Sequence, residues 1–399
     1  MRTSPANLQL AWVAAVLAAS ILSIGCSRES VVPGNLPQRS PAIDSYNNYM
    51  VLYGDPHVHT NLSDGDESPD FALRYARDVA KLDWCCITDH SEMMAADNNV
   101  ALGYYRSIPS KYDQPGKFCV LFGYEWTSAA YDHRSILTLD STIPIVSCND
   151  PNYDVPSELW KSLENYDVVG IPHHPMMQSS MNWWEYFNPD VERCVEFYSK
   201  WGMSLYDGNP RPLADPDPNH GVYKALAEQG LRFGLTAGTD THMTRPGSHL
   251  GESRPPDTLK YAQPGLTGVW ASAFTRDAIY NALKNRRCYG MTGTRVMLQF
   301  AVNGHVMGSE ISSADPPQIS VEASSKVLIQ RVVILKISGQ QVNEIKTFDL
   351  NAAEYEGSFV DDQFTDDAAY LVRVDLVNTD LALSSPIWVT KDHSGGSVF

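Results

Sequence analysis

The chain has 399 residues, of which 43% are hydrophobic and 19% are charged; this is the composition of an ordinary globular protein long enough for two domains. Its formal net charge of −17 argues against non-specific binding to a nucleic-acid duplex, because neutralising phosphates requires clustered Lys and Arg. The sequence also lacks a G-x-x-x-x-G-K-[ST] phosphate loop, so we expect a small-molecule substrate and no duplex partner.

The N-terminal residues resemble a targeting segment. An uncharged, mostly apolar run from Leu8 to Ile24 ends at Gly25-Cys26 and predicts a secretory signal over residues 1–26. A retained membrane anchor is the alternative, because the run borders on spanning length. Gly25 before Cys26 resembles a bacterial lipoprotein processing site, although Ser23 stands where leucine is usual. We therefore expect an exported protein of the periplasm or outer membrane, attached to the membrane through a lipidated Cys26.

Three further regions differ in their residue patterns. Residues 27–45 are rich in Pro, Ser, Asn and Gly, which predicts a flexible tether. Residues 46–295 alternate short apolar runs with helix-like stretches, the pattern of an α/β domain. Residues 296–393 alternate apolar and polar residues between turn formers, which predicts an antiparallel β-sandwich. We expect this second domain to cover one side of the first, and sugar binding is its alternative role.

Local signals predict several helices and loops within the α/β region. Helical spacing and start signals favour helices at residues 69–82, 153–165, 221–230 and 275–287. Long loops are expected at residues 97–117, 176–189 and 202–219. Residues 176–187, with Met181 and several aromatic residues, form either a lid over a substrate pocket or a small core of their own.

Metal-ligating residue types directly follow apolar runs that read as buried strands. In chain order they are His57, His59 and Asp64, then His90, Glu125 and His133, the pair His173-His174, and finally Asp240 and His242. His57 and His59 lie two apart in extended chain and should point the same way; for this pair alone, two structural histidines are the alternative. Because strand ends meet at the active site of a parallel-strand barrel, the pattern predicts a polynuclear metal site.

Five motifs together resemble the PHP (polymerase and histidinol phosphatase) superfamily of metallohydrolases. They are H-x-H-T-x-x-S-D-G at His57–Gly65, T-D-H at Thr88–His90, G-Y-E-W-T at Gly123–Thr127, the pair His173-His174 and G-T-D-T-H at Gly238–His242. The carbaryl-hydrolase-like branch is the most similar, and its relatives share segments resembling Gly265–Ala271, Thr275–Arg287, Val302–Gly304 and Ser384–Val389. The resemblance covers residues 49–389 and implies a distorted (β/α)7 PHP barrel followed by an antiparallel β-sandwich domain.

The resemblance also implies three divalent metal ions. The first would be held by His57, His59, Glu125 and Asp240, the second by Glu125, His133 and either His173 or His174, and the third by Asp64, His90 and His242. Asp64 stands where some members of the superfamily have histidine. Oxygen and nitrogen ligands without thiolate favour Mn²⁺, Zn²⁺ or Fe²⁺.

Several residues near these ligands are candidates for other roles. Asp240 is the candidate to orient water or accept its proton, and Asp89 is expected to brace a metal-bound histidine. Arg134, Arg245 and Lys200 could stabilise anionic charge in a transition state, or could equally be surface or ion-pairing residues.

The resulting interpretation is a metal-dependent hydrolase. We expect a phosphoesterase that acts on an anionic small molecule, with a metal-bridging hydroxide as the nucleophile. Hydrolysis of a carboxylic or carbamic ester or amide is the alternative, and a non-catalytic metal- or glycan-binding surface lipoprotein is a second one. Six cysteines follow Cys26 without any C-x-x-C pair, and we expect buried, inert thiols.

Overall fold

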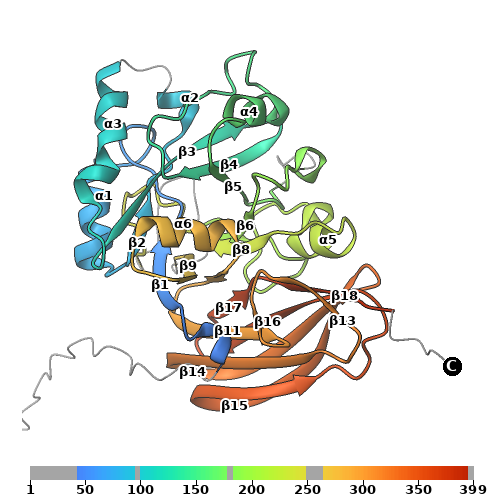
Figure 1. The fold of residues 1–399 in the computed structure, drawn as a ribbon. Coiled ribbons are helices and arrows are strands. Elements are labelled where there is room, and N and C mark those ends of the chain that lie inside the picture. The colour runs from blue at the N-terminus through green and yellow to red at the C-terminus, as the bar shows by residue number, and fades with distance from the viewer. Residues whose placement is uncertain (1–42, 95–98, 178–182, 249–263, 394–399) are drawn as a thin grey trace, which may run out of the picture. The chain divides into compact units, whose positions relative to one another are not determined.

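The computed structural model describes residues 43–94, 99–177, 183–248 and 264–393, which belong to one compact unit spanning residues 41–399 (Figure 1). The predicted signal over residues 1–26, Cys26 and residues 27–42 of the tether lie outside the described residues. Among the described residues, no helix combines the length and apolar character needed to cross a membrane. The predicted boundaries between residues 45 and 46 and between residues 295 and 296 stay predictions.

The α/β part is built on a mixed set of strands. They are β1 (Met50–Asp55), β2 (Trp84–Cys86), β3 (Cys119–Ser128), β4 (Asp132–Thr138), β5 (Val168–His173), β6 (Cys194–Ser199), β7 (Gly202–Met203), β8 (Gly234–Ala237), β9 (Leu266–Ala271) and β10 (Cys288–Met291). Strands β1, β2 and β3 are parallel neighbours, as are β5, β6 and β8. Strand β4 lies between β3 and β5 and is antiparallel to both. This set therefore contains both parallel and antiparallel neighbours.

The segments that follow β1 and β8 close this set of strands. The backbone N–H of His59 donates to the carbonyl of Thr241 at 3.0 Å, and that of Asp240 donates to the carbonyl of His57 at 3.0 Å. Val58 and Thr241 form a parallel bridge between the same segments. The two chain segments richest in predicted ligands thus lie side by side.

Helices pack around these strands (Figure 1). They are α1 (Pro69–Arg74), continued by a wider turn η2 (Tyr75–Val79), α2 (Ser91–Met94), α3 (Asn99–Tyr112), α4 (Pro156–Leu163), α5 (Val222–Ala227) and α6 (Arg276–Lys284), with short turns η1 (Asp44–Tyr46), η3 (Trp183–Tyr186) and η4 (Pro218–His220). The helices predicted at residues 69–82, 153–165, 221–230 and 275–287 are confirmed, with tighter bounds. Their ends follow local signals: the Thr275 hydroxyl, for example, accepts the N–H of Ala278 at the start of α6.

The prediction of a loop at residues 97–117 is wrong, because α3 occupies most of it. Tyr105, Ile108 and Tyr112 are buried and recur at helical spacing, so that one face of α3 packs on the core. Pro109 lies inside this helix. A proline removes a backbone hydrogen bond from a helix interior, and burial of the apolar face outweighs that loss.

The described part of residues 176–187 packs against other aromatic residues. Trp183 is fully buried, and its ring lies 5.6 Å from that of Trp184, 6.1 Å from that of Phe187 and 5.9 Å from that of Phe233. This favours the small-core alternative over a lid. Met181 lies outside the described residues.

The C-terminal part consists of strands, most of which pair antiparallel. They are β11 (Val296–Val302), β12 (His305–Val306), β13 (Glu310–Ser313), β14 (Gln318–Ser338), β15 (Gln341–Val360), β16 (Ala368–Leu376), β17 (Leu381–Ser384) and β18 (Ile387–Lys391). Strand β14 pairs with β11, β15 and β16, and only β13 and β18 are parallel. Asn303 and Gly304 both have positive φ and form the tight turn between β11 and β12. Strand β10 pairs with β9 and with β17, which links the C-terminal strands to the α/β part.

The observed fold is thus a mixed, sheet-rich α/β structure. Its antiparallel strands β4, β9 and β10 depart from seven regular β/α repeats, so the (β/α)7 barrel with a separate sandwich stays a prediction. The predicted thiols are free and buried, apart from the half-buried Cys148: Cys85, Cys86, Cys119, Cys194 and Cys288.

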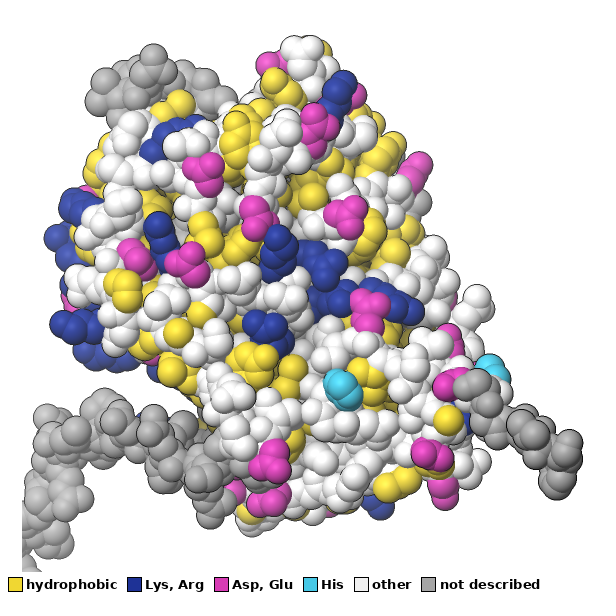
Figure 2. All heavy atoms as spheres, in the orientation of Figure 1, with side chains coloured by type: hydrophobic (Ala, Val, Ile, Leu, Met, Phe, Trp, Pro, Cys, Tyr) yellow, Lys and Arg dark blue, Asp and Glu magenta, His cyan; other side chains and the backbone are white. Residues whose placement is uncertain are grey.

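Basic side chains gather on one face of the molecule. Figure 2 shows Lys and Arg near the middle of the face drawn, although the chain as a whole is acidic. Cations at and after the end of α6 have acidic partners: Lys284 lies 2.7 Å from Asp167, and Arg286 lies 2.6 Å from Glu310. Arg232 also contacts Glu310. Pairing of this kind neutralises part of the positive charge.

Candidate metal centre

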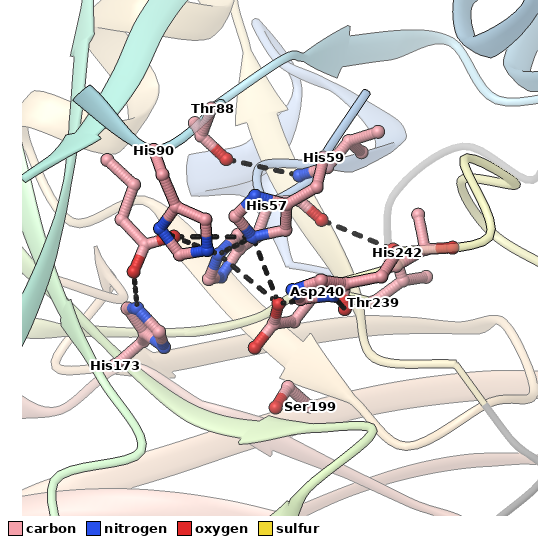
Figure 3. A network of polar contacts seen from close by, with 12 residues as sticks. His57, His59, Thr88, His90, His173, Ser199, Thr239, Asp240 and His242 are labelled. Atoms are coloured by element: carbon pink, nitrogen blue, oxygen red, sulfur yellow. Dashed lines mark hydrogen bonds and ion pairs between the residues drawn. The ribbon is translucent and has the colours of Figure 1, made fainter. Parts of the chain in front are cut away.

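The predicted ligands come from loops and strands that meet at one place. His57 and His59 follow β1, His90 follows β2, and His173 ends β5. Figure 3 shows the rings of His57, His59, His90 and His173 close to Asp240 and His242. Glu125 on β3 lies among them, fully buried. Three overlapping sets of nitrogen and oxygen atoms result.

The first ligand group consists of His57, His59, Glu125 and Asp240. The Nε2 atoms of the two histidines lie 3.2 Å apart, as two residues on the same side of an extended chain should. They lie 3.3 and 3.2 Å from Oε2 of Glu125. Oδ1 of Asp240 lies 3.6 Å from Nε2 of His57 and 3.1 Å from that of His59. Four ligand atoms therefore converge, and all four side chains are buried.

The second ligand group consists of Glu125, His133 and His173. Oε1 of Glu125 lies 2.7 Å from Nδ1 of His133 and 2.8 Å from Nε2 of His173. Glu125 thus directs one carboxylate oxygen to each of the first two groups. His174 has a ligand atom within 4.8 Å of ligand atoms of His133 and His173, while its Nδ1 lies 3.3 Å from Oδ1 of Asp132.

The third ligand group consists of Asp64, His90 and His242, with His59 beside it. Oδ2 of Asp64 lies 3.1 Å from Nε2 of His242, and Oδ1 of Asp64 lies 3.7 Å from Nε2 of His90. The side chain of Asp64 is 35% exposed and that of His133 is 26% exposed, whereas the first group is closed to solvent. A small molecule would therefore reach the centre from the side of the second and third groups.

The protonation preferences of these groups suit metal binding. Burial lowers the pKa of His59 to about 3, and neighbouring histidines add to the effect. The ring is therefore neutral, and its unprotonated nitrogen has a lone pair that can coordinate a metal. Burial alone would raise the pKa of Glu125. The nearby His90 and His173 have the larger effect and hold this pKa well below its usual value, so the carboxyl stays ionised. The pKa of Asp240 is likewise well below its usual value, because His57 and His59 outweigh its burial. Neutral imidazole and ionised carboxylate are the forms that coordinate metals.

Two further observations favour a cation at the centre. Burial lowers the pKa of His57, yet the carboxylates of Asp240 and Glu196 raise it well above its usual value. The two carboxylates thus make the first ligand group a place where positive charge is stabilised. Nδ1 of His173 is also buried without a hydrogen-bond partner among the described residues. The donor set and its electrostatics therefore fit divalent ions of the Mn²⁺, Zn²⁺ or Fe²⁺ type.

The structure shows the surroundings of two predicted auxiliary residues, Arg134 and Arg245. Arg134 is fully buried on β4, alternates with His133, and donates to Glu192 at 2.9 Å and to the carbonyl of Trp183 at 3.1 Å. This placement does not fit a role in stabilising transition-state charge. Arg245 is half-buried, and its backbone N–H donates to the Thr241 hydroxyl at 3.1 Å, which holds the loop after His242.

Asp89 does not brace a histidine ring. Its carboxylate accepts the N–H and hydroxyl of Thr60 and the hydroxyl of Ser63, each at 2.6 Å. It therefore anchors the loop that follows His59. The backbone carbonyl of Asp89 also accepts the N–H of Glu125 at 3.0 Å, which fixes the register of Glu125 next to His90.

Several residues that contact the ligands were missed from the sequence. Nδ1 of His57 lies 3.2 Å from Glu196 on β6, and Nδ1 of His90 lies 2.6 Å from the hydroxyl of Thr127. The indole N–H of Trp201 donates to Oδ2 of Asp240 at 2.6 Å. A carboxylate inside the otherwise uncharged run 194–199 was the available signal for Glu196, since a buried charge needs a partner.

Comparison with other sequences gives one family match and several relatives. Residues 103–183 and 239–326 match the family described as a protein of unknown function, DUF3604. The chain is 27% identical over 371 residues to an uncharacterized protein of Chlamydia pneumoniae and 27% identical over 365 residues to one of Chlamydia trachomatis. Each match covers 85% of this chain and 57% of the relative. The chain thus spans little more than half the length of these curated relatives.

Comparison with solved structures gives matches with low similarity scores. A two-domain protein from Bacteroides vulgatus, containing a predicted PHP-like metal-dependent phosphoesterase, matches with a TM-score of 0.45 and 15% identity, covering 87% of this chain and 97% of that one. A lesion-specific endonuclease from Pyrococcus furiosus matches with a TM-score of 0.38 and 10% identity, covering 59% and 56%. The activities named are those of the two solved proteins.

Proposed function

We propose that this protein is a metal-dependent hydrolase of the PHP type and that its substrate is a small phosphoester. The observation that carries the proposal is the position of Glu125. One of its oxygens faces His57 and His59, and the other faces His133 and His173. A carboxylate in this position would hold two divalent ions next to each other, with the third ligand group alongside.

Ions held in these groups would lower the pKa of bound water and polarise a phosphoryl oxygen. Asp240 would orient the attacking water, because its own carboxylate is fixed on both sides. Oδ1 faces His59 at 3.1 Å, and Oδ2 accepts the indole N–H of Trp201 at 2.6 Å. Its lowered pKa keeps it ionised and able to accept a hydrogen bond from water.

The third ligand group supports an anionic substrate. The amino group of Lys200 lies 2.5 Å from Nδ1 of His242 and packs over the Trp201 ring at 4.6 Å. It adds a fixed positive charge beside the more exposed side of the centre. A phosphoester brings negative oxygens to such a place, whereas a neutral carboxylic ester gains less from it.

Two measurements on the purified full chain test the proposal. Protein prepared without chelator should carry more than about one equivalent of Mn, Zn or Fe, measured by plasma mass spectrometry. It should then hydrolyse aryl phosphomonoesters or phosphodiesters in preference to an aryl acetate, an aryl carbamate and duplex DNA. Binding of less than about a tenth of an equivalent, even after reconstitution with metal, would overturn the metal centre. Preference for the acetate or carbamate would move the assignment to the carbaryl-hydrolase-like branch.

We also propose that the protein is exported, with residues 1–25 removed and Cys26 kept as a lipidated first residue. The support is the apolar run of residues 8–24 followed by Gly25-Cys26. Intact mass of the protein recovered from a bacterial membrane fraction tests this proposal. A mass that still includes residues 1–25 would contradict it.

A further inference from the structure

Glu196 stands in the middle of β6 and is almost fully buried. Its Oε1 lies 3.2 Å from Nδ1 of His57, which is the ring nitrogen directed away from the first ligand group. The Nε2 of the same ring faces Glu125 and His59. A buried carboxylate behind a ligand histidine is a costly arrangement unless it forms specific hydrogen bonds.

The same carboxylate also lies beside His173. Strands β5 and β6 are in register so that His173 is paired with Glu196. A ligand atom of His173, one of His57 and a carboxylate oxygen of Glu196 all lie within 4.8 Å of one another. The rings of His57 and His173 meet edge to face, with centroids 4.3 Å apart. Glu196 is therefore shared by one histidine of the first ligand group and one of the second.

The backbone opposite Glu196 makes room for it. A Cβ atom added at Gly238 would lie less than 3.0 Å from the Glu196 carboxylate and 2.7 Å from Cβ of His57. Real Cβ atoms do not come this close, and the neighbours are buried side chains with no free space to move into. The absence of a side chain at residue 238 is thus a second sign that this carboxylate occupies a built position.

We propose that Glu196 is a positioning residue that orients His57 toward its metal ion through a hydrogen bond and supports the neighbouring His173 through its negative charge. A carboxylate that accepts an Nδ1–H fixes the ring tautomer and leaves Nε2 free to coordinate. The inference rests on the metal-dependent function proposed above. It predicts that Glu196 supports the first and second ligand groups but not the third, which draws on Asp64, His90 and His242.

The test is metal binding by Glu196→Gln, which keeps the shape and removes the charge. Zinc affinity is measured on metal-free protein by competition with a chromophoric chelator. Wild-type protein should bind three zinc ions. In the variant, the affinity for two of them should be roughly 10- to 100-fold lower, and the affinity for the third should be unchanged. Glu322→Gln, which alters a buried glutamate of β14, is the matched control and should bind like the wild type.

Two further measurements separate the possible outcomes. Gly238→Ala displaces the carboxylate without removing it and should weaken the same two binding events. In zinc-loaded wild-type protein labelled with ¹⁵N-histidine, the hydrogen-bonded Nδ1–H resonance of His57 should be visible, and this holds even if neither variant folds.

Three results would count against the idea. No zinc binding by wild-type protein would mean that the proposed function fails. Unchanged zinc affinity in Glu196→Gln, with normal wild-type binding, would overturn the positioning role alone. Absence of the hydrogen-bonded His57 Nδ1–H resonance in the wild type would do the same.

Discussion

Strained backbone is found at individual residues of the metal centre. Asp132, His174 and Asp240 have φ values of 71°, 38° and 53°, in the left-handed region that side chains other than glycine seldom adopt. Each such residue costs about 1–3 kcal/mol and persists only when its surroundings determine it. Here Asp132 and His174 contact each other, and Asp240 lies within the first ligand group. The strain thus falls on one candidate ligand, Asp240, and on a contacting pair, Asp132 and His174, beside the second ligand group.

The residue with the widest influence is Glu125. Glu125→Gln keeps the side-chain shape but removes the negative charge that both the first and the second ligand groups use. Hydrolysis should fall by on the order of 100-fold or more, because both ions lose a ligand charge. The measurement is kcat/KM on a phosphomonoester, together with metal content.

The fold of this variant should survive, since the substitution keeps the size and shape of the side chain. Its far-ultraviolet circular dichroism should match that of the wild type and serves as the control. Wild-type turnover by the folded variant would contradict the bridging position assigned to Glu125.

The candidate ligands His57, His90, His173 and Asp240 could be picked out from the sequence because each lies at or just after the end of an apolar run. The H-x-H pair shows this best, since its spacing alone places both rings on one side of the chain. The residues behind the ligands could not be predicted in the same way. Glu196 and Trp201 act through distances that depend on how β6 lies against β1 and β8, and nothing local to them reveals this. For Arg134 the sequence left charge stabilisation and ion pairing open, and its contact with Glu192 at 2.9 Å favours ion pairing.

At the scale of elements, Asp70 joins α1 to α3. Its carboxylate accepts hydrogen bonds from Lys111, at 2.6 Å, and from the hydroxyls of Tyr104 and Tyr112. Burial raises the pKa of Asp70, but these three hydrogen bonds lower it to about 2. A carboxyl whose pKa is depressed in the folded state stabilises the protein above its unfolded pKa and loses that effect as pH falls through the folded value.

Replacing Asp70 therefore has a defined pH dependence. Asp70→Asn should lower the free energy of unfolding at neutral pH, and the difference from wild type should shrink as pH falls from about 4 to 2. Urea unfolding at several pH values measures this difference. A difference that stays constant with pH would mean that the carboxylate charge is not what links the two helices.

Element prediction succeeded for helices with clear end signals and failed where pairing is long-range. Strand β4 is the clearest example: its residues mix His133, Arg134 and Ser135 with apolar ones. Its extended form comes from pairing with both β3 and β5. Because β-strand formation depends on neighbours distant in sequence, a local pattern does not show it. Helix α3 was missed although its signal is local. Its apolar residues recur at helical spacing, but Pro109 in the middle of the segment argued against a helix.

At the scale of the whole molecule, Arg211 ties the α/β part to the C-terminal strands. It is buried and donates to the carbonyl of Thr292 at 2.8 Å, the carbonyl of Thr379 at 3.0 Å and the carboxylate of Asp380 at 2.8 Å. Arg211→Met fills similar space but leaves these acceptors without their donor. The free energy of unfolding should fall by about 3–5 kcal/mol, the range for breaking a buried ion pair.

The matched control for this variant is Arg331→Met. Arg331 pairs with Asp375 at 2.7 Å, but its side chain is 42% exposed. An exposed pair contributes about 0–1 kcal/mol. Equal losses in the two variants, measured by denaturant unfolding, would refute a linking role for Arg211.

Metal removal should also affect the stability of the molecule as a whole. Ions that bind the folded state and not the unfolded chain contribute about 2.7 kcal/mol each at a hundredfold excess over Kd. Dialysis against a chelator should therefore lower Tm by roughly 5 °C or more in calorimetry. Zn²⁺ or Mn²⁺ should restore it, whereas Mg²⁺ should not, because imidazole-rich sites suit it poorly. An unchanged Tm would contradict a buried metal centre.

The pairing of the segments after β1 and β8 has a consequence for how the protein matures. Thr239 donates its hydroxyl proton to Asp55, and these residues stand 184 positions apart in the sequence. His57 and His59 are synthesised early, yet Asp240 and His242, which complete two of the three ligand groups, leave the ribosome much later. Contacts this distant in sequence form late in folding. The nascent chain therefore contains only part of each of these two ligand groups. Tight metal binding requires that most of the α/β part has already folded.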